Sequence, residues 1–515
     1  MVRTASCAML AVLLAALPAV TGAQSTTRNL TLSDRGISNA VENEFFYDSA
    51  LSLNDINVHT DDGIITLRGR VSSLLAKRRA ADLASTVRGA RSVINQIDVE
   101  PVIDRDPVGL RMSVEEALLD DPATESFEVS VTADPEGRVI LRGDVQSWQE
   151  RSLAEFVAAG VHGVTAVTNL IDVTPRELRP DPEIAQEIRD ALRWNANVDD
   201  GLIDVAVRGG EVTLSGSVGS LAEKNVAIRI AWTAGVDDVD AAELKVAPWA
   251  RNEELRADKY SRISDEQIAD AVQEALMYDP RVSRFTIEVD SVNGLVTLRG
   301  SVADLKAKRA AITDARNTVG VVGVRDRLKV RPGDVMPSDE TIAAAVEKAL
   351  ARDPFVTALD IDVSSRGGIV SLHGDVDTWF EKGQADDVAA RVKGVVAVDN
   401  DLVVEDDAFS AVFDPYVDAW SIYGYEWYEP ESREPRQPDS VVAQQIREEF
   451  WWSPYVDEEA VRVTVKNGVA TLTGDVESWA ERRAATENAL EGGAVTVVNE
   501  LTVLSPDLQS RVEED

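Results

Sequence analysis

The sequence predicts an α+β protein of six tandem αββαβ units, each with two helices packed on one face of a three-stranded mixed sheet. Two spacings support this prediction. The tripeptide Leu-x-Gly recurs six times, and an apolar helical stripe begins 32 residues before its glycine in five copies and 33 before it in the second. A second glycine follows 19 or 20 residues later. Such repetition indicates repeated structural units. The tripeptides end at Gly69, Gly143, Gly216, Gly300, Gly374 and Gly474.

Each unit opens with the apolar stripe, which predicts its first helix. Apolar residues at i, i+4 and i+8 line one helical face. In the fourth unit, Ser264 followed by Gln267 is typical of a helix start, and Pro280 ends the helix because it lacks an N–H donor. The stripes begin at Ile37, Leu110, Ile184, Ile268, Ile342 and Val442.

The hairpin, second helix and third strand follow in the same unit. Apolar residues alternate from Phe285 to Val289, and Asn293-Gly294 favours a tight turn before a returning strand. Residues 303–318 are rich in Ala, Lys and Arg, which are good helix formers. The segment 321–330 then supplies the last strand. Two helices on one face of the sheet bury both apolar faces.

The spacings set the domain boundaries. We expect units at residues 33–100, 109–174, 181–247, 264–331, 338–405 and 439–504, with an acidic tail at 505–515. Residues 1–23 are typical of a cleaved signal peptide: Arg3, an apolar run and small residues before Gln24. A membrane anchor is the alternative, which Pro18 disfavours. Export to the periplasm is therefore expected, and cleavage would remove Cys7, the single cysteine.

The segments between units differ in character. Residues 331–337 are so short that we expect the fourth and fifth units to pack together, whereas residues 248–262 are charged and predicted to be solvated. The joint at residues 406–438 holds eight aromatic residues between Phe409 and Tyr428, unlike a Gly- or Ser-rich linker. It is interpreted either as a strap across neighbouring units or as an interfacial or partner-binding patch.

A large apolar residue stands five positions after every Leu-x-Gly, where the second helix should begin, and Lys or Arg follows closely. One interpretation is that this residue packs under the helix start beneath a solvated charged face. The other is an amphipathic edge that touches lipid headgroups. The six residues are Leu74, Trp148, Leu221, Leu305, Trp379 and Trp479. The candidate lipid or partner contacts are Trp148, Trp379, Trp479, Trp420, Trp427, Tyr425, Arg482 and Arg483.

Composition argues against several function classes. The net charge of −38 opposes binding to nucleic acid, which requires a basic surface, and also opposes approach to anionic membranes. The three histidines, His59, His162 and His373, occupy non-equivalent positions in different units, and catalytic motifs such as Gly-x-Ser-x-Gly and His-Glu-x-x-His are absent from the sequence. Acidic runs lack the spacing of a calcium loop. We therefore expect no enzyme activity, no cofactor and no metal centre.

The repeated motifs resemble the BON domain, a bacterial module of periplasmic proteins. The matching features are the Ser/Asp-Asp/Glu-x-x-Ile helix start, Asp-Pro after that helix, Gly-x-Val-x-Leu-x-Gly-x-Val across the hairpin, and the ending seen from Gly394 to Val404. The first and third copies lack the proline, and the third also lacks the Asn of the ending. These differences count against full equivalence of the six copies.

The resemblance implies a non-catalytic role in the cell envelope. BON proteins are associated with phospholipid surfaces, outer-membrane maintenance, osmotic-stress protection, chaperone-like activity and, in one branch, potassium binding. The expectation for this chain is a peripheral envelope protein that contacts phospholipid or client proteins. Two alternatives remain: a scaffold in which repetition gives avidity, and a soluble protein whose acidic surface responds to cations.

Overall fold

The computed structural model describes most of the chain from residue 32 onward, within one compact body that begins at Leu32. The predicted signal peptide, the acidic tail and nearly all of the aromatic joint lie outside the described residues. The described ranges are 32–48, 50–51, 54–101, 106–124, 127–174, 179–233, 235–251, 259, 263–279, 281–282, 285–332, 336–404 and 437–504.

Each of the six units runs helix, strand, strand, helix, strand, as predicted. Unit 1 comprises α1 (Asp34–Tyr47), β1 (Asp55–Asp61), β2 (Ile64–Val71), α2 (Leu74–Thr86) and β3 (Ser92–Val99). Unit 2 comprises α3 (Pro107–Asp120), β4 (Glu128–Ala133), β5 (Arg138–Val145), α4 (Trp148–Ala159) and β6 (Ala166–Val173). Unit 3 comprises α5 (Asp181–Trp194), η1 (Asp200–Leu202), β7 (Ile203–Arg208), β8 (Glu211–Val218), α6 (Leu221–Ala231), β9 (Asp238–Val246) and η2 (Pro248–Arg251).

The second half of the chain repeats this order. Unit 4 comprises α7 (Asp265–Tyr278), β10 (Ile287–Val292), β11 (Leu295–Val302), α8 (Leu305–Arg316) and β12 (Gly323–Val330). Unit 5 comprises α9 (Asp339–Arg352), η4 (Ala358–Asp360), β13 (Ile361–Arg366), β14 (Ile369–Val376), α10 (Trp379–Ala390) and β15 (Ala397–Val404). Unit 6 comprises α11 (Asp439–Trp452), β16 (Val461–Lys466), β17 (Val469–Val476), α12 (Trp479–Glu491) and β18 (Thr496–Val503).

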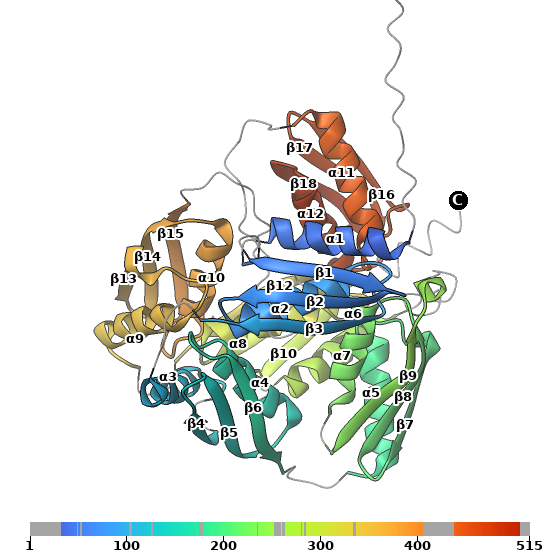
Figure 1. The fold of residues 1–515 in the computed structure, drawn as a ribbon. Helices are drawn as coiled ribbons and strands as arrows, with labels where there is room; N and C mark the ends of the chain where they lie inside the picture. Colours follow the sequence, from blue (N-terminus) through green and yellow to red (C-terminus); the bar gives the residue numbers. More distant parts are fainter. Residues whose placement is uncertain are drawn as a thin grey trace, which may run out of the picture. The chain divides into compact units, whose positions relative to one another are not determined.

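The sheet topology confirms the predicted α+β class. In every unit the second strand lies in the middle, antiparallel to the first and parallel to the third. The two helices cover one face of the sheet (Figure 1). The predicted stripes form the core beneath them: Ile268 and Leu276 of α7 pack with Leu298 of β11. The other helical face and the open sheet face are left to solvent or to neighbouring units.

The Leu-x-Gly motif has a steric cause. Leu67 is fully buried in the core of unit 1, and the following Gly69 adopts a φ of +137° beside the start of β1. A Cβ atom at Gly69 would lie 1.9 Å from the Asp55 carbonyl oxygen, which no side chain can tolerate. The leucine therefore fills the core while the glycine allows the two strands of the hairpin to approach.

The aspartate at the helix start holds the hairpin turn. In unit 4, the Asp265 carboxylate accepts the backbone N–H groups of Asn293 at 2.7 Å and of Gly294 at 2.9 Å. One charged side chain thus fixes the turn against the helix N-terminus, where negative charge is stabilised. Unit 2 has Pro107 at this position, and its longer turn is held by its own Asp134. The corresponding residues in the other units are Asp34, Asp181, Asp339 and Asp439.

The Asn of the predicted ending joins the second helix to the third strand. In unit 5, Asn400 Nδ2 donates to the Lys382 carbonyl at 2.9 Å, and Asn400 Oδ1 accepts the Leu402 N–H. Unit 3 lacks this Asn, and there the pairing of β8 with β9 shifts register between Thr213 and Ser215. The departure that the sequence showed in the third copy therefore appears as a strand irregularity.

Two expectations need correction. Phe285 was predicted to belong to the first strand of unit 4, but β10 begins at Ile287, and Phe285 packs against the core from the preceding bend. The segment 248–262 was predicted to be solvated, but the Lys259 side chain is only 4% exposed and pairs with Asp200 at 3.3 Å. Its ammonium group also donates to the Leu192 carbonyl, so it ties the segment to unit 3.

Candidate functional site

The six predicted positions do begin the second helices. At five of them the apolar side chain contacts a neighbouring unit, and the side chain at the sixth, Trp379, lies outside the described part. Leu74 of unit 1 lies in the hydrophobic core of unit 2, and Leu221 of unit 3 lies in the core of unit 1. Leu305 of unit 4 likewise lies in the core of unit 5, which confirms that the fourth and fifth units pack together. These residues are therefore contacts between units.

Trp148 makes the corresponding contact between units 2 and 3. Its ring stacks on Trp232 with centroids 3.9 Å apart, and the guanidinium of Arg151 lies 4.5 Å from the Trp148 centroid. The neighbouring Gln149 donates to the Trp232 carbonyl at 2.8 Å. The Trp148 side chain remains partly exposed, so an edge of this stack stays accessible.

Trp479 lies between units 6 and 4. The guanidinium groups of Arg482 and Arg316 lie 5.1 and 5.4 Å from its centroid, close enough for cation–π attraction. Arg482 also donates to the carbonyls of Asn499 and Leu501, and burial lowers its pKa. Arg483 lies 4.0 Å from Glu487. Trp379 begins α10, although its side chain lies outside the described part, as do Trp420, Tyr425 and Trp427.

The helix-start contacts have a direction. Unit 1 reaches unit 2 through Leu74, unit 2 reaches unit 3 through Trp148, and unit 3 returns to unit 1 through Leu221. The first three units therefore form a closed cycle of contacts. In the second half, unit 6 contacts unit 4 through Trp479 and unit 4 reaches unit 5 through Leu305.

A second kind of contact pairs one unit from each half of the chain. The residue before the second glycine donates its N–H to the carbonyl of the last residue of a first helix. Arg88 of unit 1 bonds Trp452 of unit 6 at 2.9 Å. The same bond joins unit 2 to unit 5 and unit 4 to unit 3. These bonds run from His162 to Arg352 at 2.7 Å and from Val319 to Trp194 at 2.9 Å.

Charged residues near the second-helix starts serve the same contacts. Lys306 of unit 4 pairs with Asp121 of unit 2 at 2.5 Å, and each side chain is only 5% exposed. Arg309 pairs with Asp386 of unit 5 at 2.6 Å, and Arg78 pairs with Glu155 of unit 2 at 2.6 Å. The sequence interpretation of a solvated charged face is wrong for these residues, because each is paired across a boundary between units.

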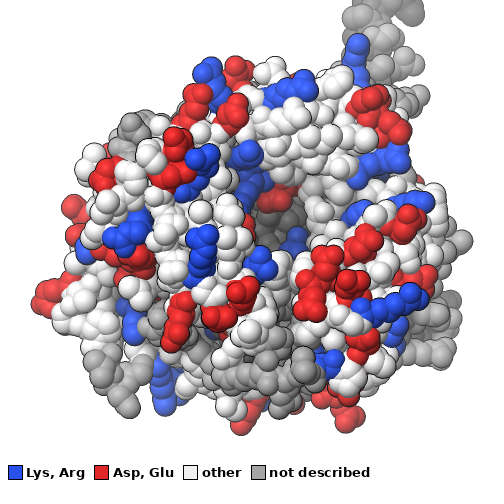
Figure 2. Space-filling view, turned by 60° about the horizontal axis from the view of Figure 1, so that its bottom comes forward, with Lys and Arg blue, Asp and Glu red and all other residues white. Residues whose placement is uncertain are grey.

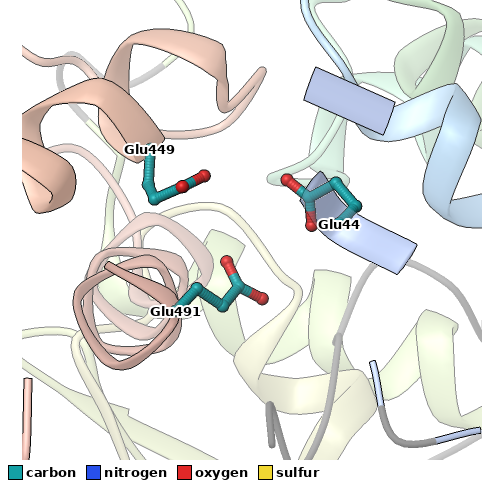
Figure 3. Close-up of side chains that lie close together, drawn as sticks. All are labelled: Glu44, Glu449 and Glu491. Atoms are coloured by element: carbon teal, nitrogen blue, oxygen red, sulfur yellow. The ribbon is translucent and has the colours of Figure 1, made fainter. Parts of the chain in front are cut away.

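Three carboxylates meet between units 1 and 6. Figure 3 shows Glu44 of α1 facing Glu449 of α11 and Glu491 of α12, and one oxygen from each lies within 4.8 Å of the others. Burial, with Glu491 and Glu448 nearby, raises the pKa of Glu449 to about 8. Carboxylate oxygens are ligands for hard cations. Acidic clusters are nevertheless common without a metal, and this geometry alone does not identify one.

A cavity of about 300 Å³ lies mainly between units 3 and 4. Its walls combine aromatic and charged groups, including Trp194, Tyr278 and the buried pair of Asp279 with Arg281. Burial and the nearby Glu187 raise the pKa of Tyr278 to about 12. A neutral phenol and a closed ion pair therefore line part of the cavity with polar groups.

The surface shows mixed charge despite the acidic composition. On the face shown in Figure 2, basic and acidic side chains are interspersed, and the surface is hollowed near its centre. None of the described helices combines the length and apolar character needed to cross a membrane. One apolar stripe is exposed on α3, where Val108, Met112 and Leu119 are 59%, 49% and 61% exposed.

Comparison with known families identifies the repeat. A profile of the BON domain matches residues 33–101, 108–175, 180–248, 264–332, 338–406 and 438–505, which together exceed half of the chain. The chain belongs to the BON domain family. We call units 1–6 BON 1 to BON 6 from here on.

Two relatives are each 30% identical to part of the chain. Osmotically-inducible protein Y of Escherichia coli is 30% identical over 145 residues, covering 27% of this chain and 72% of the relative. Outer membrane lipoprotein DolP of Haemophilus influenzae is 30% identical over 142 residues, covering 27% and 73%. A solved C-terminal domain of CdsD from the Type III secretion system of Chlamydia trachomatis is 16% identical, and the match covers 44% of this chain and all of that domain with a TM-score of 0.12.

The sequence located the BON helix starts but not their partners. Nothing in a repeat spacing says which copy a Leu or Trp will contact, because these contacts join residues far apart in sequence. One signal was available: Trp and Leu at a helix start, where a solvated helix would carry polar residues, indicate a buried neighbour. The turn-holding aspartates were read as helix-start residues, and only the hairpin contacts reveal their second role.

Proposed function

We propose that this chain is an exported, non-catalytic protein of the cell envelope whose BON repeats bind phospholipid surfaces or envelope client proteins, in envelope maintenance or osmotic-stress protection. The observation that carries the proposal is the presence of six BON domains together with relatives named for osmotic induction and for the outer membrane. The predicted signal peptide at residues 1–23 and a location in the periplasm belong to the same proposal.

Two groups of side chains are candidate contacts for lipid, one exposed and one partly exposed. The first is the α3 stripe of Val108, Met112 and Leu119, whose spacing places the three side chains within about 40° on one helical face. The second is Trp479 with Arg482, in which an aromatic ring lies beside a cation. Amphipathic groups of this kind favour the boundary between water and lipid.

The other candidate residues remain part of the proposal, but they differ in how accessible their side chains are to lipid. Trp148 is held in its stack with Trp232, so only its exposed edge is available for lipid. Arg483 lines the cavity between BON 3 and BON 4 and is a poorer contact for a surface. Trp379, Trp420, Tyr425 and Trp427 are kept as candidates on their sequence alone.

Vesicle co-sedimentation tests the proposal. Full-length mature protein should sediment with phospholipid vesicles, and at low salt it should bind zwitterionic vesicles better than anionic ones, because anionic lipid repels a net charge of −38. Replacing Val108, Met112 and Leu119 with serine should weaken binding at least tenfold if the α3 stripe contacts lipid. Exposed residues away from the stripe, such as Thr464, supply the control substitution. Absence of sedimentation with every vesicle composition would remove the lipid branch.

A client-binding role is the alternative within the proposal, and the cycle of contacts favours it. Because BON 1 to BON 3 contact one another through two buried leucines and the Trp148–Trp232 stack, they present several repeats in a fixed arrangement. A partner that touches more than one repeat gains avidity. Crosslinking in intact envelopes, followed by identification of the linked proteins, would distinguish a client from a lipid surface.

A further inference from the structure

The pair of BON 3 and BON 4 has a cavity at the contact where the pair of BON 2 and BON 5 has an ion pair. The two contacts are equivalent, because each is made by the same backbone bond to the last residue of a first helix. That residue is Arg352 of α9 in BON 5 and Trp194 of α5 in BON 3. Differences between the two contacts therefore lie in the side chains.

In the BON 2 and BON 5 pair, an arginine of one unit fills the contact. The Arg352 guanidinium lies 3.2 Å from the Glu116 carboxylate and 2.6 Å from the Asp120 carboxylate, both on α3 of BON 2. The Arg352 side chain is only 10% exposed. A cation from one unit is thus enclosed by two carboxylates of its partner.

In the BON 3 and BON 4 pair, the carboxylate is kept but the arginine is not. Glu274 of α7 stands six residues after the first residue of its apolar stripe, as Glu116 does in BON 2. Tyr278 takes the place of Asp120, and Trp194 takes the place of Arg352. The position opposite the glutamate therefore holds an aromatic ring where the equivalent contact holds a guanidinium.

The cavity lies at this substitution. Trp194, Glu274 and Tyr278 all line the space of about 300 Å³ between α5 and α7, two helices that Figure 1 shows close together. Pockets for small molecules begin at about this volume. A carboxylate and two aromatic rings around one space are the groups that recognise an organic cation, because the faces of aromatic rings attract positive charge.

The charges that act on Glu274 are acidic. Partial burial, together with the neighbouring Asp190, Asp270 and Glu187, raises the pKa of Glu274. Glu187 itself already has a basic partner, since it forms an ion pair with Arg179. The local field therefore favours a positively charged guest beside Glu274.

The arginines of the cavity wall have other interactions. Arg281 pairs with Asp279 at 2.5 Å, and Arg483 lies 4.0 Å from Glu487. Arg229 also interacts within the chain. None of the three contributes to the charge environment that sets the pKa of Glu274, so they do not replace the missing Arg352.

We propose that the cavity between BON 3 and BON 4 binds a small organic cation, an ammonium or guanidinium compound, which Glu274 holds by charge and Trp194 and Tyr278 hold by their aromatic rings. The guest takes the place that the Arg352 guanidinium fills between BON 2 and BON 5. This site goes beyond the proposed envelope function and does not depend on lipid or client binding.

Titration calorimetry of the full mature chain at low ionic strength tests the site. The probes are choline and agmatine, and the matched control is 3,3-dimethylbutan-1-ol, which has the shape of choline without its charge. Choline or agmatine should bind at one site per chain. The neutral alcohol should bind at least about tenfold more weakly, because it cannot pair with Glu274.

Three variants locate the binding in the cavity. Glu274→Gln should weaken choline and agmatine binding by about tenfold or more. Glu266→Gln removes the same charge from an exposed position of α7 and should change the affinity by less than about twofold. Trp194→Arg reproduces the BON 5 arrangement and supplies the cation from within, so it should abolish binding and raise the melting temperature.

Circular dichroism verifies that each variant is folded. If Trp194→Arg disturbs the fold, the comparison of choline with the neutral alcohol and the comparison of Glu274→Gln with Glu266→Gln decide the matter without it.

Four outcomes would overturn the proposal. The first is the absence of saturable binding of both cations. The second is equal binding of choline and the neutral alcohol, which would make the cavity a site for apolar groups. The third is equal loss of affinity in Glu274→Gln and Glu266→Gln, which would indicate diffuse attraction by the net charge of −38. The fourth is binding of acetate in place of the cations, which would make the arginines of the wall the binding groups.

Discussion

Trp148, the first residue of α4, stacks on Trp232 at the end of α6, with ring centroids 3.9 Å apart. The stack links BON 2 to BON 3 at the same position where Leu74 links BON 1 to BON 2 and Leu221 links BON 3 to BON 1. The large apolar residue at the start of the second helix therefore joins the first three repeats into one packed assembly.

Loss of one such contact should destabilise two units at once. Leu221→Ala removes a side chain that is 7% exposed in the core of BON 1 although it belongs to BON 3. The expected cost is about 2–4 kcal/mol, because a cavity remains where the leucine was. Urea denaturation followed by circular dichroism measures it. Leu119→Ala, at a leucine that is 61% exposed, is the control and should change stability by less than about 0.5 kcal/mol.

If Leu221→Ala lowers the stability of BON 3 alone, the contact of Leu221 with BON 1 does not contribute to the stability of BON 1. Hydrogen exchange resolves this point, because it reports protection of β1 to β3 separately from β7 to β9. Faster exchange in both sheets is the expected result.

The repeat and its strand order could be predicted because they depend on local rules. Period-two and period-3.6 patterns place Leu298 and Ile268 in the core, and the steric demand at Gly69 recurs at every Leu-x-Gly. The site could not be predicted in the same way. Glu44 and Glu449 are 405 positions apart, and each looks like an ordinary solvated helix residue until the docking of BON 1 with BON 6 brings them together.

The glycine of Leu-x-Gly and a glycine in a hairpin turn should respond differently to substitution. Gly69→Ala would place a Cβ 1.9 Å from the Asp55 carbonyl oxygen, so the hairpin of BON 1 must open. We expect a loss of at least about 3 kcal/mol, since backbone strain and a clash act together. Gly367→Ala is the control: its φ is +61° but nothing lies within 4 Å of the new Cβ. It should cost only about 1 kcal/mol, the ordinary penalty for a left-handed residue.

Thermal melts of both glycine variants measure the difference. Equal destabilisation would show that strand approach at Leu-x-Gly is not the reason for the motif.

The whole chain should be more stable at pH 5 than at pH 9. Burial raises the pKa of Asp353 to about 6, of Glu481 to about 7 and, with its acidic neighbours, of Glu449 to about 8. A carboxyl group with a raised folded pKa stabilises the fold fully below its ordinary pKa near 4, and this contribution is lost as pH rises through the folded value. Denaturant midpoints should therefore decline from pH 5 to pH 9, and a midpoint that rises over this range would contradict the assignment.

Below pH 4 a second group of carboxylates reverses the trend. Hydrogen bonds from Ser291, Gly294 and Asn293 lower the pKa of Asp265, although its partial burial opposes them. Its contribution is present above the ordinary pKa and is lost as the carboxylate takes up a proton in acid. The stability maximum is therefore expected near pH 5.

Substitution of the buried ion pair between Lys306 and Asp121 measures how much this pair stabilises the contact of BON 4 with BON 2. The two charges lie 2.5 Å apart with only 5% of each side chain exposed, and Asp121 Oδ1 also accepts the Ala123 N–H at 2.9 Å. Lys306→Met keeps the chain length but leaves Asp121 buried without its cation. We expect this to cost about 3–5 kcal/mol, because an uncompensated buried charge is more costly than a lost attraction.

Adding Asp121→Asn to Lys306→Met should recover most of that loss. Asparagine retains the oxygen that accepts the Ala123 N–H, while the buried charge disappears together with its partner. Urea midpoints of the single and double variants then separate the two contributions, since the double variant differs from Lys306→Met only in the charge and one polar atom. If the double variant is no more stable than Lys306→Met, the uncompensated charge of Asp121 is not the cause of the lost stability. The contact would then depend on the lysine stem packing against BON 2.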